Sequence, residues 1–127
     1  MVGTDVGGMV AYVCLRMSPE ALESAVIMNT VIPGLAPWDE VEHNSHIWHV
    51  AFHAIPDLPK LLFQPKVPLY FGYFYDVILG DSCGVDEEAR RRYAESYSDP
   101  ISMRQGFELC RSVAADVKDN LAAHHAL

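Results

Sequence analysis

The sequence predicts a mainly helical chain with one or two short parallel strands near its N-terminus. Apolar residues recur at helical spacing along most of the chain, whereas one short apolar run, Ala25 to Met28, suits a buried parallel strand. One strand cannot form a sheet by itself, so two interpretations stay open. The chain is either a mainly α protein or a piece of a larger α/β sheet.

The first predicted element after the N-terminal loop is a helix from about Gly7 to Met17, because its apolar residues follow the helical period. Ser18 and Pro19 interrupt it, since proline cannot continue a helix. The strand follows, and a loop leads out of it. The residues that indicate this loop are Pro33, Gly34 and Pro37.

From Trp38 onward the chain reads as helices. Residues 67–80 are apolar almost all round, so we expect a buried helix that ends near Gly80. Its aromatic side chains are most simply core residues rather than ligand contacts. They are Tyr70, Phe71, Tyr73, Phe74 and Tyr75.

Three aspartates are predicted to cap helices, namely Asp57, Asp86 and Asp99. The basic run Arg90–Arg92 is most simply a solvated helix face. After Ala115 the helical pattern fades, so we expect a loose C-terminal end.

Composition and charge narrow the class of partner. Half of the 127 residues are hydrophobic, enough for one modest domain. Lys and Arg number 9 against 17 Asp and Glu, a net charge of −8, which disfavours nucleic acid and anionic membrane surfaces as partners. No apolar run approaches the roughly 18 residues of a membrane span. The odd set of distant cysteines indicates reduced thiols and a cytoplasmic location; these are Cys14, Cys83 and Cys110.

The stretch GTDVGG, residues 3–8, lies between a possible strand residue, Val2, and the first helix. It fits the nucleophile elbow, a turn so tight that its flanking positions must lack bulk and its apex side chain is pushed outward. Asp5 would stand at the apex and attack as a carboxylate, and the Val6 N–H would supply half of an oxyanion hole. On the pattern alone, a plain turn aspartate is the simpler interpretation.

Longer segments extend the pattern. Five segments, taken in order, carry a resemblance: MVAYVCLRMSPEALESAVIMNTVIPG, PWDEVEHNSHIWHVAFHAIPDLPKLL, FYDVIL, AESYSDPISMRQGFELCRS and VKDN. Together they resemble the α/β-hydrolase family, in the branch of epoxide hydrolases and haloalkane or haloacetate dehalogenases. The resemblance implies an α/β-hydrolase fold that is incomplete in this chain. Residues 1–37 would be the elbow, helix and strand of the core domain, residues 38–114 the helical cap, and residues 115–127 a flexible tail.

The resemblance also implies a reaction. Asp5 would form an alkyl-enzyme ester with a small epoxide or organohalide, and water activated by a histidine–acid pair would hydrolyse it, without metal or cofactor. In the family that pair follows the cap, so we expect this chain alone to lack it. The second hypothesis is a non-catalytic, self-associating helical module that retains the cap.

The cap segments suggest substrate contacts through the same resemblance. Epoxide hydrolases hold the epoxide oxygen with cap tyrosines, and the corresponding slots fall at Cys110 and near Phe52, which cannot donate a hydrogen bond. Dehalogenases hold the halogen with a histidine and a tryptophan, and Trp48 and His49 occupy that neighbourhood. A packing role for these two residues fits equally well.

Histidines offer two further possibilities that we do not favour. His46, His49 and His53 would share a helix face, but no glutamate lies inside the pair that has metal-ligand spacing, so we expect these rings to line the underside of the cap without a metal. His124 and His125 fall in the expected loose end, where a general base would not be held within reach of its proton.

Overall fold

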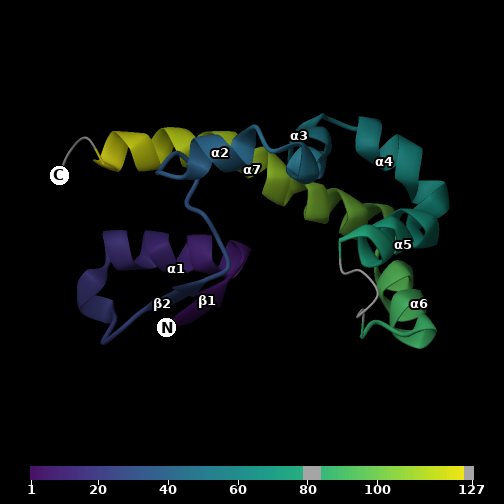
Figure 1. The fold of residues 1–127 in the computed structure, drawn as a ribbon, viewed down its shortest axis with the longest axis horizontal. Coiled ribbons are helices and arrows are strands. Elements are labelled where there is room, and N and C mark those ends of the chain that lie inside the picture. The colour runs from purple at the N-terminus through teal and green to yellow at the C-terminus, as the bar shows by residue number, and fades with distance from the viewer. Residues whose placement is uncertain (79–83, 125–127) are drawn as a thin grey trace. The chain divides into compact units, whose positions relative to one another are not determined.

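The computed structural model describes residues 1–78 and 84–124, and these residues are mainly helical with two short parallel strands (Figure 1). This confirms the predicted mainly α composition. The chain divides into two compact units. Unit 1 consists of Met1–Trp48 and Ser112–Leu127, and unit 2 of His49–Arg111.

Unit 1 is built around a parallel strand pair. β1 (Val2–Thr4) pairs with β2 (Val26–Met28), with Gly3 opposite Ile27. α1 (Val6–Met17) connects them and packs along both strands, and a 3-10 turn, η1 (Pro19–Ala21), follows it (Figure 1). The predicted first helix and the parallel pairing of its two flanking strands are confirmed.

β2 is more exposed than predicted. The sequence indicated a buried parallel strand, yet Val26 is 48% and Met28 43% exposed. A parallel strand is buried only when layers cover both of its faces. Within the described residues, α1 is the helix that packs on the pair. The apolar composition of β2 therefore exceeds what its surroundings in this structure bury.

The chain after β2 is held by the C-terminal half of α7 (Pro100–His124). The buried Asn120 donates a hydrogen bond from Nδ2 to the Pro33 carbonyl at 3.0 Å. Gly34 has φ +82°, and a Cβ there would come within 2.8 Å of the Val117 carbonyl oxygen. The sequence predicted a loose end after Ala115, but α7 continues as a helix to His124, and these contacts hold its last turns. A short helix, α2 (Trp38–Glu42), and a 3-10 turn, η2 (Ser45–Ile47), complete the described elements of unit 1.

Unit 2 is helical throughout its described elements. These are α3 (Trp48–Ala54), whose first residue belongs to unit 1, α4 (Leu58–Phe63), the 3-10 turn η3 (Gln64–Lys66), α5 (Val67–Val77), α6 (Glu87–Ser96) and the first half of α7. The core joins α5, α6 and α7. It consists of Val67, Ala94, Met103 and Phe107, with Phe63 and Phe71 packed against them.

α5 is not buried all round, contrary to the prediction from its apolar composition. Val67 and Tyr70 are buried, but Leu69 is 72% and Val77 61% exposed. The helix packs on α6 through one face, and within the described residues its other face is not covered to the same extent. Gly80, the predicted helix end, lies outside the described residues.

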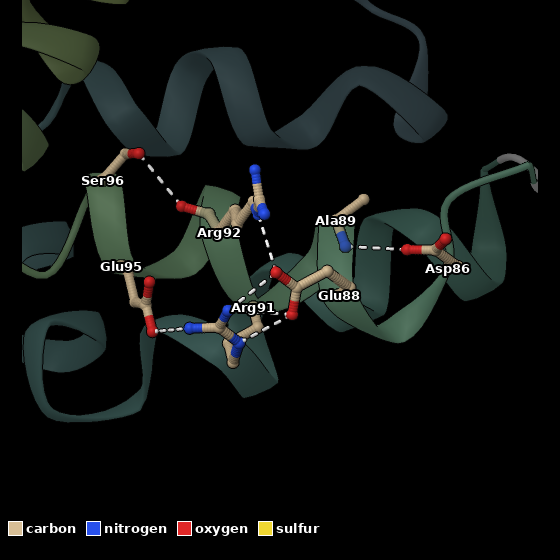
Figure 2. A network of polar contacts seen from close by, with 7 residues as sticks. All are labelled: Asp86, Glu88, Ala89, Arg91, Arg92, Glu95 and Ser96. Carbon is tan, nitrogen blue, oxygen red and sulfur yellow. Dashed lines mark hydrogen bonds and ion pairs between the residues drawn. The ribbon is translucent and has the colours of Figure 1, made fainter.

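Two of the three predicted aspartate caps are confirmed. Asp86 accepts a hydrogen bond from the Ala89 N–H at 2.8 Å (Figure 2), and Asp99 accepts one from the Ser102 N–H at 2.9 Å. Asp57 stands at the N-cap position of α4, but its side chain makes no cap hydrogen bond within the described residues. Its backbone has φ 59°, whereas capping side chains usually extend from β-region residues.

The arginine run forms the solvated face that the sequence predicted, except at its first residue. Arg91 pairs with Glu88 and Glu95, and Arg92 pairs with Glu88, all on the exposed side of α6 (Figure 2). Arg90 instead is partly buried, because it pairs with Asp76 at 2.8 Å and lies over the Tyr75 ring.

Candidate functional site

Asp5 forms the turn between β1 and α1, as predicted, and its backbone is strained. Its φ of 53° and ψ of −129° lie outside the wells that non-glycine residues normally occupy. The Asp5 N–H donates to the Met28 carbonyl at 3.2 Å, and the Asp5 carbonyl accepts from the Gly8 N–H at 2.9 Å. The sheet and the helix therefore fix this residue from both sides, which is how strained backbone persists at functional sites.

Two of the flanking positions have no room for a Cβ atom, so they require glycine. A Cβ on Gly3 would lie 2.1 Å from the Gly7 carbonyl oxygen, and a Cβ on Gly8 would lie 2.5 Å from Cγ2 of Thr30. A Cβ on Gly7 would meet nothing within 4 Å, so its missing side chain is not what lets α1 approach the strands. The tightness predicted for the turn is thus carried by Gly3 and Gly8.

The Asp5 carboxylate does not behave as a helix cap. A capping aspartate accepts a hydrogen bond from the first turn of its helix, as Asp86 does. In the part of the chain that the structure describes, Asp5 is exposed and makes no such bond. The first N–H groups of α1, including that of Val6, have no partner within the helix and carry its positive end. An exposed carboxylate and N–H groups suited to an oxyanion are therefore neighbours.

Unit 2 contains a hollow of about 450 Å³, within the size range of small-molecule sites. Nine of its eleven lining residues carry an aromatic or imidazole ring. The lining residues come from α3, α5, α6, α7 and the turn after α6. They are His49, His53, Tyr70, Phe71, Phe74, Tyr75, Tyr93, Tyr97, Met103, Gly106 and Phe107.

A polar cluster from three helices lies at this hollow. His53 of α3 contacts the Tyr70 hydroxyl of α5 through Nε2, and its Nδ1 lies 3.8 Å from Sγ of Cys110 on α7. Burial, together with the neighbouring His49, lowers the pKa of His53 to about 4. Burial raises the pKa of both Tyr70 and Cys110. All three groups are therefore uncharged near neutral pH.

The structure brings two of the predicted substrate contacts to this cluster. His49 lines the hollow with its ring centroid 5.9 Å from that of His53, burial lowers its pKa, and Cys110 contacts His53 directly. Phe52 instead packs against the rings of His53 and Phe63, at 6.2 and 5.6 Å. Trp48 begins α3 and is 40% exposed.

Sequence reasoning did not assign the polar roles of His53 and Tyr70. The spacing of His49 and His53 indicated a shared helix face, which is a usable signal for His53. Tyr70 was interpreted as core, and it is indeed only 8% exposed. Nothing in its local sequence indicated that its hydroxyl would meet a histidine 17 residues away.

The remaining candidates are distributed as follows. Among the residues described, no three His, Cys, Asp or Glu side chains gather into a group that could hold a metal. His124 ends α7, whereas His125 and Cys83 lie outside the described residues. Cys14 and Cys110 are free thiols.

None of the helices in the described ranges has both the length and the apolar character needed to cross a bilayer.

Comparison with solved structures gives a likeness of fold. No protein-family model and no curated protein matches the chain. The fold is similar to the crystal structure of Cfl2 wild-type from Burkholderia cenocepacia, with a TM-score of 0.79 and 23% sequence identity. The match covers 99% of this chain and 44% of that chain, so this chain spans less than half the length of Cfl2. At this identity the likeness concerns the fold alone.

Proposed function

We propose that this chain is the elbow-and-cap part of an α/β hydrolase of the epoxide hydrolase or dehalogenase type, with Asp5 as the nucleophile. The observation that carries the proposal is the strained backbone of Asp5, φ 53° and ψ −129°, between a parallel strand and a helix. A cap aspartate usually extends from the β region, and turn aspartates tolerate the left-handed region, but a ψ of −129° lies outside both. Among the described residues its carboxylate makes no cap bond that would occupy it.

The reaction would proceed by displacement at carbon. A carboxylate oxygen of Asp5 forms a bond to the carbon while the carbon–halogen bond breaks and the halide leaves as an anion. With an epoxide, a C–O bond breaks instead and its oxygen takes up a proton from water. The product is an alkyl ester on Asp5. When water attacks that ester, the Val6 N–H stabilises the oxyanion. The base that activates this water is expected after the cap, as the family resemblance implies.

An organohalide is the better first trial substrate for this chain. A halide leaves as an anion and needs no proton, whereas an epoxide oxygen needs a hydrogen-bond donor. The two expected donor slots hold Phe52, which has no donor, and Cys110, whose thiol is a weak one. We therefore expect slow single alkylation of Asp5 by a halide, without repeated turnover.

Intact-mass spectrometry after incubation with a reactive primary alkyl bromide tests this proposal. Cysteine thiols also react with bromides, so the adducts must be separated by chemistry. Hydroxylamine cleaves an ester on Asp5 but not a thioether on cysteine. We expect one hydroxylamine-sensitive adduct, located on Asp5 by peptide mapping and lost in Asp5→Asn. A wild-type chain without this adduct, or an unchanged adduct in Asp5→Asn, would contradict the proposal.

A specific observation also favours the second hypothesis, that the chain self-associates. β1 and β2 expose apolar side chains, including Val2 at 68% and Val26 at 48%. Open strand edges and exposed apolar faces tend to pair with other chains. Sedimentation velocity should show concentration-dependent association that Val26→Lys weakens. A monomer at all working concentrations would count against this hypothesis.

A further inference from the structure

We propose that the hollow of unit 2 is a binding site for an uncharged aromatic molecule that carries a hydroxyl group. The proposal goes beyond the chemistry of Asp5, because it uses residues of unit 2 alone. It rests on the rings that line the hollow, on the lack of charge among them, and on the direction of the hydrogen bonds in the His53 cluster.

The lining favours aromatic ligands over aliphatic ones. Its rings already meet edge to face: Phe74 lies 5.1 Å from Tyr70 and 5.2 Å from His49, and Phe71 lies 5.1 Å from Tyr97, with interplanar angles of 87°, 83° and 69°. A ligand ring can continue this arrangement, which stabilises aromatic pairs beyond the area they bury.

The charge of the lining favours a neutral ligand. Among the described residues, the side chains that line the hollow include no carboxylate, ammonium or guanidinium group. A charged ligand would therefore lose its hydration without gaining an ion pair. The lowered pKa of His53 points the same way, since it means that this environment disfavours a positive charge.

The hydrogen-bond direction selects a donor on the ligand. The imidazole of His53 is neutral, so one ring nitrogen donates and the other accepts. A phenol is a stronger donor than a thiol, so the Tyr70 O–H donates to Nε2, and the Nδ1–H donates toward Sγ of Cys110. Tyr70 lines the hollow, and a phenol oxygen that donates its proton retains the capacity to accept another. A ligand hydroxyl can donate to it.

Calorimetric titration of the full chain tests the proposal with matched probes. The first probe is 1-naphthol, and four relatives each change one property. 1-Methoxynaphthalene lacks the donor, decahydro-1-naphthol lacks the aromatic rings, 1-naphthoate is an anion, and 1-naphthylmethylammonium is a cation. We expect naphthol to bind at least tenfold more tightly than the saturated, anionic and cationic probes, and about fivefold more tightly than the ether.

Variants at two tyrosines locate the hydrogen bond. Tyr70→Phe should remove the fivefold preference for naphthol over the ether. Tyr73→Phe should keep it, because Tyr73 lies on the same helix, is 44% exposed and does not line the hollow. Circular dichroism would verify that both variants fold. Absence of naphthol binding, equal binding of the saturated probe, or tighter binding of the cation would overturn the proposal. So would a hydroxyl preference that survives in Tyr70→Phe.

This test separates the inference from the hydrolase proposal. Binding of naphthol by unit 2 requires no reaction at Asp5, and alkylation of Asp5 by a small bromide requires no aromatic ring. Binding without alkylation would support the binding site in unit 2 and contradict the proposed nucleophile role of Asp5. Alkylation without naphthol binding would support the nucleophile role and contradict the binding site.

Discussion

In unit 1 the candidate nucleophile is positioned by the backbone, whereas in unit 2 the polar cluster is positioned by side-chain packing. Asp5 is held at φ 53° by hydrogen bonds to Met28 and Gly8. His53 meets Tyr70 and Cys110, which follow it by 17 and 57 residues and come from other helices. A local backbone constraint leaves a mark in local sequence, and a cluster assembled from distant helices does not. The two units should therefore respond differently to substitution.

The largest effect is expected from a methyl group at the turn of unit 1. In Gly3→Ala the new Cβ would lie 2.1 Å from the Gly7 carbonyl oxygen, so the strand or the helix must move. We expect a loss of about 3 kcal/mol or more of stability, the range in which backbone and overpacking effects fall. Urea unfolding followed by tryptophan fluorescence measures this in unit 1, because Trp38 and Trp48 both belong to it.

The matched control for that substitution is Gly7→Ala. A Cβ at Gly7 would meet nothing within 4 Å, and alanine favours the helix relative to glycine. We expect Gly7→Ala to leave stability unchanged or to raise it by up to about 1 kcal/mol. Equal losses in the two variants would show that the constraint at Gly3 is not the steric one described for unit 1.

In unit 2 the corresponding probe is acid rather than a methyl group. The folded state holds His53 neutral down to a pKa of about 4, whereas the unfolded chain binds a proton near 6.5. Between these values the unfolded state binds more protons, so stability should fall as the pH is lowered from 6.5 toward 4. We expect a loss of roughly 1–2 kcal/mol, after allowing for the partial exposure of the ring.

Urea unfolding followed by circular dichroism at pH 7 and pH 4.5 measures this loss, and His53→Gln provides the comparison. The variant should lose less stability on acidification than the wild type, while the smaller contribution of His49, whose pKa burial also lowers, remains in both. An identical pH dependence in the two proteins would mean that His53 is not shielded as the packing of unit 2 indicates.

The contrast between the units explains which features could be read from the sequence. The tight turn between β1 and α1 was predictable, because Gly3, Asp5 and Gly8 lie close together in sequence and the space around the two glycines is restricted locally. The end of α7 was not predictable, because Asn120 is polar in sequence and yet buried through its bond to Pro33. A polar residue at a buried position hides the helical period of the segment around it.

Burial in unit 2 was predicted only in part. Tyr70 was placed in the core, and its burial agrees, but its hydroxyl partner depends on how α3 and α5 pack. Exposure was misjudged at Leu69 and Val26 for a related reason, since apolar composition indicates a tendency to be buried but not what covers the residue. The role of Asp5 as a nucleophile remains a prediction.

A smaller effect is expected from relieving the strain at Asp5 itself. Glycine adopts positive φ without cost, so Asp5→Gly should release the strain, of order 1–3 kcal/mol, while adding the unfolded-chain entropy of a glycine. We expect a net gain of about 1 kcal/mol in stability together with loss of the ester adduct. A loss of stability in urea unfolding would instead indicate that the Asp5 side chain is structural.

The smallest effects should come from the two aspartates at N-cap positions in unit 2. Asp86 caps α6 from the β region with a 2.8 Å bond to the Ala89 N–H (Figure 2), whereas Asp57 precedes α4 at φ 59° and, within the described residues, makes no cap bond. Asp86→Gly should therefore lower stability by a few tenths of a kcal/mol, and Asp57→Gly should raise it by a similar amount. Thermal unfolding of both variants measures the two opposite shifts under one condition. Equal losses would mean that Asp57 also caps its helix in solution.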